Sequence, residues 1–586
     1  MNKRIVQTIS LILAVCILSG CRLPFHADNR TEGEKKYPEF LTIDVFDVQA
    51  NYQGLQRGWF AKIVKDKFNM QLNIIATNKE SNGDAAYETM RASGRLGDII
   101  LTSVADGRLS ELVREGIVLD FQDYIDTHEN LAKYSEQIKI TSSYANAEGA
   151  WAIPSEISME QPWEPAEYSE PTNAPTLRWD LYKEVGFPHM STLEDLLLVL
   201  KNMQDAAGKS DSGNDVYAFS LFRDWDGGVM QNAGALTALY GNDIQGFVML
   251  NPSTGKIESI ADRDSAYFRA LHFLFEANQM GLVDPESPVQ NYETVALKMR
   301  DGAVLYSFWP WMGISLYNSK EHMSGGKGFA SVVINDASYL CWGSDSDGKQ
   351  NFAVMIGAET KDKGRMVDFV DWLYSDEGIE CLGSPTGDFR GPEGLTWENV
   401  NGVPTLTEFG IDVFVNMDTD IQVPSEYGEG TWREGASSIN FKPVDQKVTD
   451  RKGIPFRYSQ WQDYQDRTAT IVSNEWQKHY STDKTPLDYY MQRKMLTVIP
   501  GTEWAAGEYP EYLQTVEEQC RQIIVDYSWR LVYAADEEDF LRLKEEMIDT
   551  LDRLEFNELV EVNIQSQKER YELFQKVISD SSEGAR

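Results

Sequence analysis

A strand pattern stands near the start of the chain, Phe40-Leu41-Thr42-Ile43-Asp44-Val45-Phe46. Its alternation and β-branched content predict a β-strand. Beyond it, apolar residues at helical spacing predict a helix over 59–68, and residues 71–76 form a second strand pattern. A helix over 87–92 and a short buried strand over 98–101 follow. Strands that alternate with helices indicate a parallel, doubly wound α/β sheet.

Helical patterns dominate the later part of the chain. Ser191-Thr192-Leu193-Glu194 has the form of a capping box ahead of an apolar stripe that ends near Met203. Residues 264–279 predict another helix, and 303–308 a strand that leads into Trp309-Pro310-Trp311. Near the C-terminus, 516–531, 536–554 and 571–578 predict helices with charged faces. The segment 423–464 is the least regular part.

Size and charge restrict the class of protein. The chain has 586 residues, of which 42% are apolar, so it has enough apolar material for a sizeable core. The formal charge of −38 repels phosphate backbones, so we expect no nucleic-acid partner. Five cysteines and six histidines leave little for a disulfide scaffold or a histidine-rich metal site, and we expect no cofactor and no metal.

The first residues have the pattern of a secretory signal. Lys3 and Arg4 precede an apolar run over 9–18, which is too short to span a bilayer. Leu18-Ser19-Gly20-Cys21 then resembles the bacterial lipobox, in which Cys21 would receive a diacylglyceryl group and become the first residue. The alternative is an ordinary signal peptide with a chance cysteine. We expect a signal over 1–20, a flexible tether over 21–38, and a protein anchored at the outer face of the bacterial cytoplasmic membrane.

Two smaller expectations follow from this location. Outside the cell there is no ATP pool, and the chain has no phosphate-binding loop of the form Gly-x-x-x-x-Gly-Lys-Ser/Thr. We therefore expect the protein to be neither a kinase nor an ATPase. The cysteines that remain in the mature chain are odd in number, so we expect them to be unpaired, partly buried and structural: Cys341, Cys381 and Cys520.

Several short motifs occur in an order that belongs to a known family. They are Gly97-Asp98-Ile99-Ile100, Gly149-Ala150-Trp151-Ala152-Ile153-Pro154, residues 177–194, Met299-Arg300-Asp301-Gly302, Trp309-x-Trp311 and Asp371-Trp372-Leu373-Tyr374-Ser375-Asp376-Glu377-Gly378. Over roughly residues 40–400 the chain resembles the extracellular solute-binding proteins of ATP-binding-cassette (ABC) importers, in the sugar-binding group that includes maltose-binding protein. Gly391 to Trp397 and the C-terminal helices are similar to a longer lipoprotein subgroup of Gram-positive bacteria.

The resemblance implies a type II periplasmic-binding-protein-like fold with two α/β lobes, each a doubly wound sheet, and extra C-terminal helices. If the family's lobe boundaries apply to this chain, lobe one consists of residues 38–152 and 304–360, and lobe two consists of residues 153–303 and 361–586. The resemblance further implies a non-catalytic monomer that captures a carbohydrate, expected to be an oligosaccharide, as a hinge closes. Its partner would be the permease of an ABC transporter.

The family's cleft positions imply nine ligand-contacting residues in this chain: Tyr52, Trp59, Asp106, Glu156, Asp224, Trp225, Trp309, Trp311 and Arg390. Aromatic faces suit the C–H surfaces of sugars, and planar polar groups suit their hydroxyls. Alternatives stay open for several of them. The tryptophans could be core residues, Asp224 a solvated turn charge, and Arg390 a structural ion-pair partner.

Other classes of function compete with this one. A surface-anchored glycoside hydrolase needs only two carboxylates, and 92 acidic residues cannot exclude a pair by counting. A binding module for a membrane sensor kinase would have the same sequence features as a transport receptor. Asp345-Ser346-Asp347-Gly348 has oxygen spacing like that of a calcium loop but lacks the final glutamate, so a plain turn is favoured.

Overall fold

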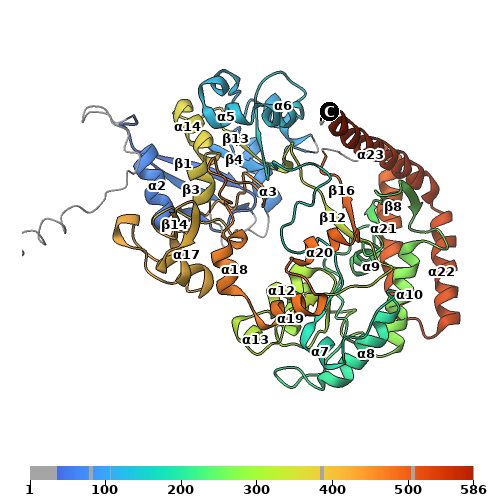
Figure 1. Ribbon diagram of the computed structural model, residues 1–586. Coiled ribbons are helices and arrows are strands. Elements are labelled where there is room, and N and C mark those ends of the chain that lie inside the picture. Colours follow the sequence, from blue (N-terminus) through green and yellow to red (C-terminus); the bar gives the residue numbers. More distant parts are fainter. Residues whose placement is uncertain (1–35, 78–82, 106, 383–387, 503–508, 585–586) are drawn as a thin grey trace, which may run out of the picture.

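The computed structural model describes residues 36–77, 83–105, 107–382, 388–502 and 509–584. The predicted signal, Cys21 and Asp106 lie outside these ranges. The chain forms two α/β lobes (Figure 1), as the sequence predicts. In the ranges given, no helix is both long enough and apolar enough to cross a membrane.

Lobe one is built on a six-stranded sheet in the order β2-β3-β1-β4-β13-β5. Its parallel centre consists of β1 (Leu41–Asp47), β3 (Met70–Ile75) and β4 (Ile99–Thr102). β13 (Lys349–Ile356) runs antiparallel to both β4 and β5 (Ile153–Ser155), and β2 (Gly54–Leu55) is an antiparallel edge strand. The chain steps from β1 to β3 on one side and to β4 on the other, so the carboxyl ends of β1 and β4 flank a topological switch point.

Helices cover both faces of this sheet. α2 (Gly58–Phe68) buries Trp59, Phe60, Val64 and Phe68, and it ends at Asn69 in a left-handed conformation. The others are α3 (Gly83–Ala92), α4 (Arg108–Arg114), α5 (Glu129–Lys133), α6 (Ser135–Ser143), α14 (Lys363–Leu373) and α15 (Asp376–Cys381). Tyr37, at the end of the predicted tether, is already buried against Phe68, so the folded body begins slightly earlier than we expected.

The predicted division into lobes is wrong for residues 361–461, which belong to lobe one. Val367, Phe369 and Val370 of α14 lie in one hydrophobic core with β1 and β3. The chain then continues through β14 (Trp397–Val400), β15 (Val403–Leu406), α16 (Glu408–Gly410) and α17 (Trp432–Gly435), and their buried side chains join the same core. The physical reason is the apolar surface of α2, which α14 and α17 cover together.

Lobe two also differs from the prediction, because its strands form separate short sheets instead of one doubly wound sheet. β10 (Tyr306–Ser307) and β11 (Phe329–Ser331) both pair antiparallel with β6 (Thr176–Arg178), so residues 304–331 belong here and not to lobe one. β7 (Asp243–Gln245), β8 (Val248–Asn251) and β9 (Lys256–Ser259) form an antiparallel meander. β12 (Tyr339–Trp342) pairs parallel with β16 (Leu496–Ile499).

Most of the mass of lobe two is helical. Its helices are α7 (Trp179–Glu184), α8 (Asp195–Ala207), α9 (Gln231–Thr237), α10 (Ala266–Gln279), α11 (Tyr292–Arg300), α12 (Pro310–Tyr317), α13 (Lys320–Ser324), α19 (Ile471–Tyr480) and α20 (Pro486–Gln492). The C-terminal helices α21 (Glu511–Val532), α22 (Glu537–Asp552) and α23 (Phe556–Gly584) cover the outer side of lobe two (Figure 1). α21 packs against α10, and residues such as Cys520 and Ile524 join the core of this lobe.

Three crossing segments join the lobes: 156–175, 343–348 and 462–470, the last including α18 (Gln462–Thr468). The first two segments run side by side. Pro165 and Gly343 form an isolated antiparallel β-bridge, and the amide of Ser344 donates to the carbonyl of Glu164 at 2.8 Å. Gln465 of α18 donates to the hydroxyl of Tyr168 at 3.0 Å. α18 lies between the two lobes in Figure 1. Because the lobes are joined by a small number of crossing segments, they can move relative to each other about a hinge.

Candidate functional site

The lobe-two side of the site forms where the first crossing segment enters this lobe. Ser307, the last residue of β10, pairs with Thr176 at the start of β6, so both lie at one edge of the small sheet. Trp309 and Trp311 follow this edge at the start of α12. The Ser307 hydroxyl donates to the carbonyl of Trp309 at 2.7 Å and accepts the amide of Gly313 at 3.0 Å. These bonds hold the first turn of α12 in place.

An aromatic surface forms at this edge from Trp225, Tyr292, Trp309 and Trp311. Trp225 stacks on Tyr292 with ring centroids 4.8 Å apart, and it lies 5.3 Å from Trp309 and 6.1 Å from Trp311. Trp225 is 37% exposed and Trp311 is 50% exposed. Grouped, partly exposed indole rings are more typical of a ligand platform than of a core. The structure therefore brings together three of the predicted tryptophans.

Asp224 supports this surface through the backbone. Its Oδ2 accepts the amide of Tyr292, the first residue of α11, at 2.9 Å, so it ties the loop that carries Trp225 to that helix. Asp226 follows Trp225 in the chain and fixes the loop through two further hydrogen bonds. Its carboxylate accepts the amide of Gln231 at 2.9 Å and the indole N–H of Trp529 in α21 at 2.7 Å. The loop of the aromatic surface is thus tied to three helices, α9, α11 and α21.

A pocket of about 560 Å³ lies next to this loop. It is lined by Arg223, Pro288, Gln522, Ile523, Asp526, Tyr527, Trp529, Arg530 and Tyr533. The guanidinium of Arg223 lies over the ring of Trp529 at 5.2 Å and pairs with Asp526 at 3.3 Å. The C-terminal helix α21 therefore contacts the loop of the candidate site directly.

The lobe-one side of the site is the carboxyl edge of the six-stranded sheet. β5 ends at Ser155 where β13 begins at Lys349, and β4 and β1 end at the same edge. Glu156 leaves this edge in a left-handed conformation, φ 47°, and its carboxylate pairs with Lys349 at 2.7 Å. Burial alone would raise the pKa of Glu156, but Lys349, Lys442 and Arg457 together lower it below its usual value. Glu156 is thus a charged group at the start of the first crossing segment.

Asp47, at the end of β1, is a fully buried carboxyl of this edge. Its Oδ1 accepts the amide of Gln49 at 2.8 Å, while its Oδ2 is unpartnered among the described residues. Burial raises the pKa of Asp47 to about 7, against the hydrogen bonds from Gln49 and Asn440. The folded protein therefore holds a proton here that the unfolded chain releases near its ordinary value of 3.8.

This buried acid predicts a pH dependence of stability. Between these two pKa values the unfolded chain binds fewer protons, so the contribution of Asp47 to stability is lost as the pH rises toward 7. From pH 5 to pH 7 the loss is about 2 kcal/mol, and we expect Asp47→Asn to remove it. Urea unfolding at both pH values measures this. An equal pH dependence in the two proteins would contradict the assignment.

The remaining predicted residues lie elsewhere. Trp59 is completely buried, stacks on Trp432 at 4.7 Å and donates to its carbonyl at 3.0 Å, so it is a core residue and offers no face to a ligand. Arg390 is also buried and pairs with Glu380 and Asp450, as in its structural alternative. Both expectations are thereby corrected. Asp106 lies outside the described residues.

Tyr52 is half exposed in the loop before β2, with its ring against Gly54. Within the described ranges no hydrogen bond or ring contact joins it to the aromatic surface. Tyr292, in contrast, belongs to that surface and was missed by sequence analysis. No motif marks it, because a hydrogen bond from its amide to Asp224 and the stacking of its ring on Trp225 bring it into the surface.

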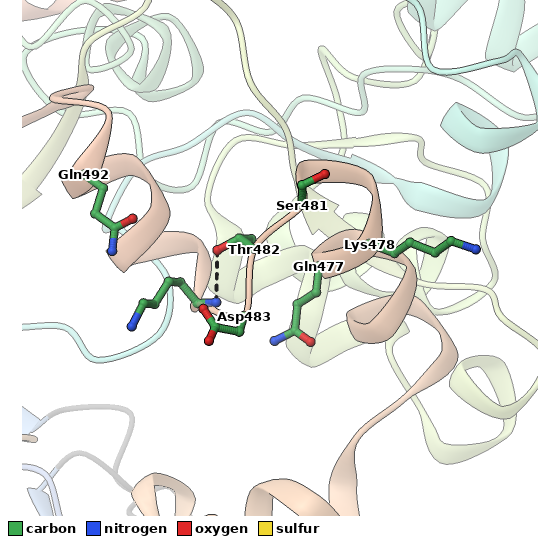
Figure 2. A pocket seen from close by; sticks show the side chains of 7 residues that line it. Gln477, Lys478, Ser481, Thr482, Asp483 and Gln492 are labelled. Carbon is green, nitrogen blue, oxygen red and sulfur yellow. Dashed lines mark hydrogen bonds between the residues drawn. The ribbon is translucent and has the colours of Figure 1, made fainter.

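A second pocket lies between the end of α19 and α20 (Figure 2). It is lined by Gln477, Lys478, Ser481, Thr482, Asp483, Lys484 and Gln492. The Lys484 amide donates to the Thr482 hydroxyl at 3.1 Å. Figure 2 shows Lys478 pointing away from the other labelled side chains. The lining has no aromatic ring, so this pocket lacks the platform that the interlobe edge provides.

The turn at Asp345 and the cysteines complete the comparison with the sequence. Asp345 accepts the amide of Asp347 at 3.0 Å, which is the hydrogen bond of an Asx turn. Across the described ranges, no three acidic, histidine or cysteine side chains gather as metal ligands. Cys341, Cys381 and Cys520 are free thiols and are buried, as predicted.

Comparisons with known proteins identify the fold. No family model and no curated protein matches the chain. The calcium-free structure of the alginate-binding protein AlgQ2 matches with 16% identity and a TM-score of 0.54, covering 91% of this chain and 99% of its own. The ABC-transporter substrate-binding protein FusA of S. pneumoniae, in complex with kestose, matches with 14% identity, a TM-score of 0.55 and the same coverage.

An extracellular solute-binding protein from Bifidobacterium longum subsp. infantis matches with 12% identity and a TM-score of 0.54, covering 91% of this chain and 98% of its own. At these identities the likeness concerns the fold. The agreement extends over nearly the whole of each chain. The chain therefore has the two-lobed fold of the solute-binding proteins of ABC transporters.

Proposed function

We propose that this protein is a carbohydrate receptor of an ABC importer and that it binds an oligosaccharide between its lobes. The observation that carries the proposal is the aromatic surface of Trp225, Tyr292, Trp309 and Trp311 at the edge where lobe two meets the crossing segments. Flat rings match the C–H faces of sugar rings, and this surface groups four such rings. Kestose, which FusA binds in its complex, is an oligosaccharide of this class.

The mechanism follows from the crossing segments. A ligand that touches the aromatic surface and the carboxyl edge of lobe one at once makes both sets of contacts only when the lobes are closed. It therefore shifts the population toward the closed state. A permease that recognises this state would receive the sugar, and no bond is made or broken by the chain itself.

The location belongs to the same proposal. The signal over 1–20 and the lipobox-like sequence at Cys21 support export and a lipid anchor at the outer face of the membrane. Mass spectrometry of the membrane fraction would detect a diacylglyceryl adduct on Cys21. A mature protein that begins at another residue and carries no lipid would refute the anchor without affecting sugar binding.

A thermal-shift screen of residues 22–586 against neutral and acidic oligosaccharides tests the function. A ligand at ~100 times its dissociation constant adds about 2.7 kcal/mol to stability and raises the melting temperature. Chromatography of the same samples shows whether the sugar stays intact. Cleaved sugar would favour a glycoside hydrolase instead. A stabilising sugar with no neighbouring permease genes would favour a module that serves a sensor kinase.

Trp529 is expected to support binding without touching the ligand. Trp529→Phe keeps the aromatic ring but removes the indole N–H that Asp226 accepts at 2.7 Å. Burial raises the pKa of Asp226, and the hydrogen bond from Trp529 opposes this rise by stabilising the carboxylate. Without that bond the buried carboxylate lacks one of its donors, so the loop that carries Trp225 is held less firmly. We expect sugar affinity to fall about tenfold, measured by calorimetry.

A matched control is Trp476→Phe, which removes a comparable buried bond from the indole N–H of Trp476 to the carbonyl of Ser331 at 2.8 Å. This variant should lose a similar amount of stability, about 1 kcal/mol, without a change in sugar affinity. Equal affinity losses in the two variants would mean that Trp529 acts only through general stability.

A further inference from the structure

A group of charged side chains surrounds the start of the first crossing segment, and we call it the hinge-side cluster: Glu156, Lys349, Asp388, Lys442 and Arg457. Two ion pairs account for four of its members. Glu156 pairs with Lys349 at 2.7 Å, and Asp388 pairs with Arg457 at 3.1 Å. Arg457 is further fixed because its guanidinium lies over the ring of Phe389 at 3.8 Å.

Lys442 is the fifth member, and neither of the two ion pairs includes it. Across the ranges the structure describes, no hydrogen bond or ion pair engages its amine, whereas its backbone carbonyl accepts the amide of Glu156 at 2.7 Å. Lys442 is only half-buried, so a ligand can reach it. Burial lowers the pKa of Lys442, and the positive charges of Arg457 and Lys349 act in the same direction, against Glu156 and Asp388. A partly desolvated ammonium without a partner is costly.

The position of Lys442 connects it to the proposed site. Its neighbour Asn440 donates a backbone hydrogen bond to Asp47 at the carboxyl end of β1. Lys349, at the start of β13, pairs with Ser155 at the end of β5. The hinge-side cluster therefore lies along the same sheet edge that lobe one presents at the crossing segments. This position puts Lys442 on the side of lobe one where the crossing segments leave it.

Other acidic groups nearby do not neutralise Lys442. Asp345 and Glu167 influence Lys349, whose pKa is raised by Glu156 and by these two against the effect of burial. The influences on Lys442 come from Glu156 and Asp388, and the carboxylates of both are already engaged by other cations. The cluster thus contains one cation more than its ion pairs use.

We propose, building on the receptor function above, that the bound carbohydrate carries a carboxylate, as in a uronate or sialate unit, and that Lys442 binds this group. A neutral sugar would leave the ammonium uncompensated in a half-buried place, whereas a carboxylate forms a charge-assisted hydrogen bond with it. Arg457 and Lys349 add to the local positive potential. The overall charge of −38 makes such a local cation necessary for an acidic ligand.

The test compares free acids with their methyl esters. The probes are uronate-containing and sialylated oligosaccharides, each beside the same sugar with its carboxyl groups esterified, and calorimetry measures their affinities. For the bound sugar we expect the free acid to bind at least about tenfold more tightly than the ester. Lys442→Gln should weaken the free acid about 30-fold and the ester less than about threefold.

Two further variants make the result specific. Lys442→Arg keeps the charge and should retain most of the preference for the acid. Lys452→Gln removes an exposed lysine whose amine lies 3.8 Å from Glu393, and it should leave both affinities unchanged. Because Lys442 has no partner to lose, Lys442→Gln should fold with an unchanged or higher melting temperature.

The outcomes separate this inference from the proposed function. Equal binding of acid and ester, or of neutral sugars that Lys442→Gln does not affect, would overturn the carboxylate ligand and leave the sugar receptor intact. If no neutral or acidic oligosaccharide binds, both proposals fall. If the acid is preferred but Lys442→Gln does not reduce that preference, the assignment to Lys442 is wrong.

Discussion

Arg390→Met is expected to lower the free energy of unfolding by about 3–5 kcal/mol at neutral pH. Arg390 is 2% exposed, and its guanidinium donates to Glu380 at 3.0 Å and to Asp450 at 2.8 Å. It also lies over the ring of Trp397 at 4.2 Å. Methionine fills a similar volume but removes the hydrogen bonds to both buried carboxyl groups and leaves Asp450 without its cation, and these losses are the main cost.

The pH dependence of this variant offers a second readout. Burial raises the pKa of Glu380 to about 8, even though Arg390 lowers it. Without Arg390 the pKa would rise further, so the folded variant would keep its proton to higher pH, and the deficit of Arg390→Met should grow as the pH is raised from 7 toward 9. Chemical denaturation at the two pH values measures both effects.

Arg263→Met is the matched control. Arg263 and Glu545 form an ion pair in which both side chains are largely exposed, at 62% and 49%. Exposed pairs contribute little, so the change should stay within about 0.5 kcal/mol. If Arg390→Met were as mild as this control, the buried network would not stabilise lobe one.

Trp225→Ala is expected to weaken sugar binding about 100-fold, which is close to 2.8 kcal/mol. Trp225 lies at the centre of the aromatic surface, in contact with Tyr292, Trp309 and Trp311. Its removal deletes the central ring of the platform and also the ring on which its neighbours pack. The ligand is the sugar with the largest thermal shift, and calorimetry gives its affinity.

Tyr512→Ala serves as the control for an exposed aromatic residue. Tyr512 is 63% exposed on α21 and bonds to Glu558 at 3.1 Å, apart from the aromatic surface. Its loss should leave sugar affinity unchanged. Both variants should remain folded, since neither side chain belongs to a core. Full affinity in Trp225→Ala would move the binding site away from this surface and would contradict the proposed function.

Local sequence patterns predicted several elements in both lobes. The alternation over 40–46 became β1 at Leu41–Asp47, and the helical spacing over 59–68 became α2 at Gly58–Phe68. The helix over 264–279 begins after Ser265, whose hydroxyl accepts the amide of Phe268 at 3.2 Å. The box at Ser191–Glu194 was less accurate. There Asp195 accepts the amides of Ser191 and Thr192, and Glu194 instead pairs with Arg269.

The assignment of segments to lobes was less predictable than the elements themselves. Nothing in residues 361–461 marks them for lobe one, because the contacts that place them there are distant in sequence. Phe369 meets Phe68 at 5.5 Å, and Phe441 meets Phe352 at 5.6 Å. The family's motif order correctly indicated two lobes, but it did not locate every crossing.

Taken alone, the sequence determined the α/β class, most helices and strands, the unpaired buried cysteines and the two-lobed fold of a solute-binding protein. These features depend on short-range periodicity and on the order of motifs. Only the tertiary structure decided which aromatic and charged residues are available to a ligand. Trp59 and Trp225 were both predicted to contact a ligand, yet Trp59 is covered by Trp432, 373 positions away, whereas Trp225 is partly exposed. Burial is set by long-range packing, which local patterns do not encode.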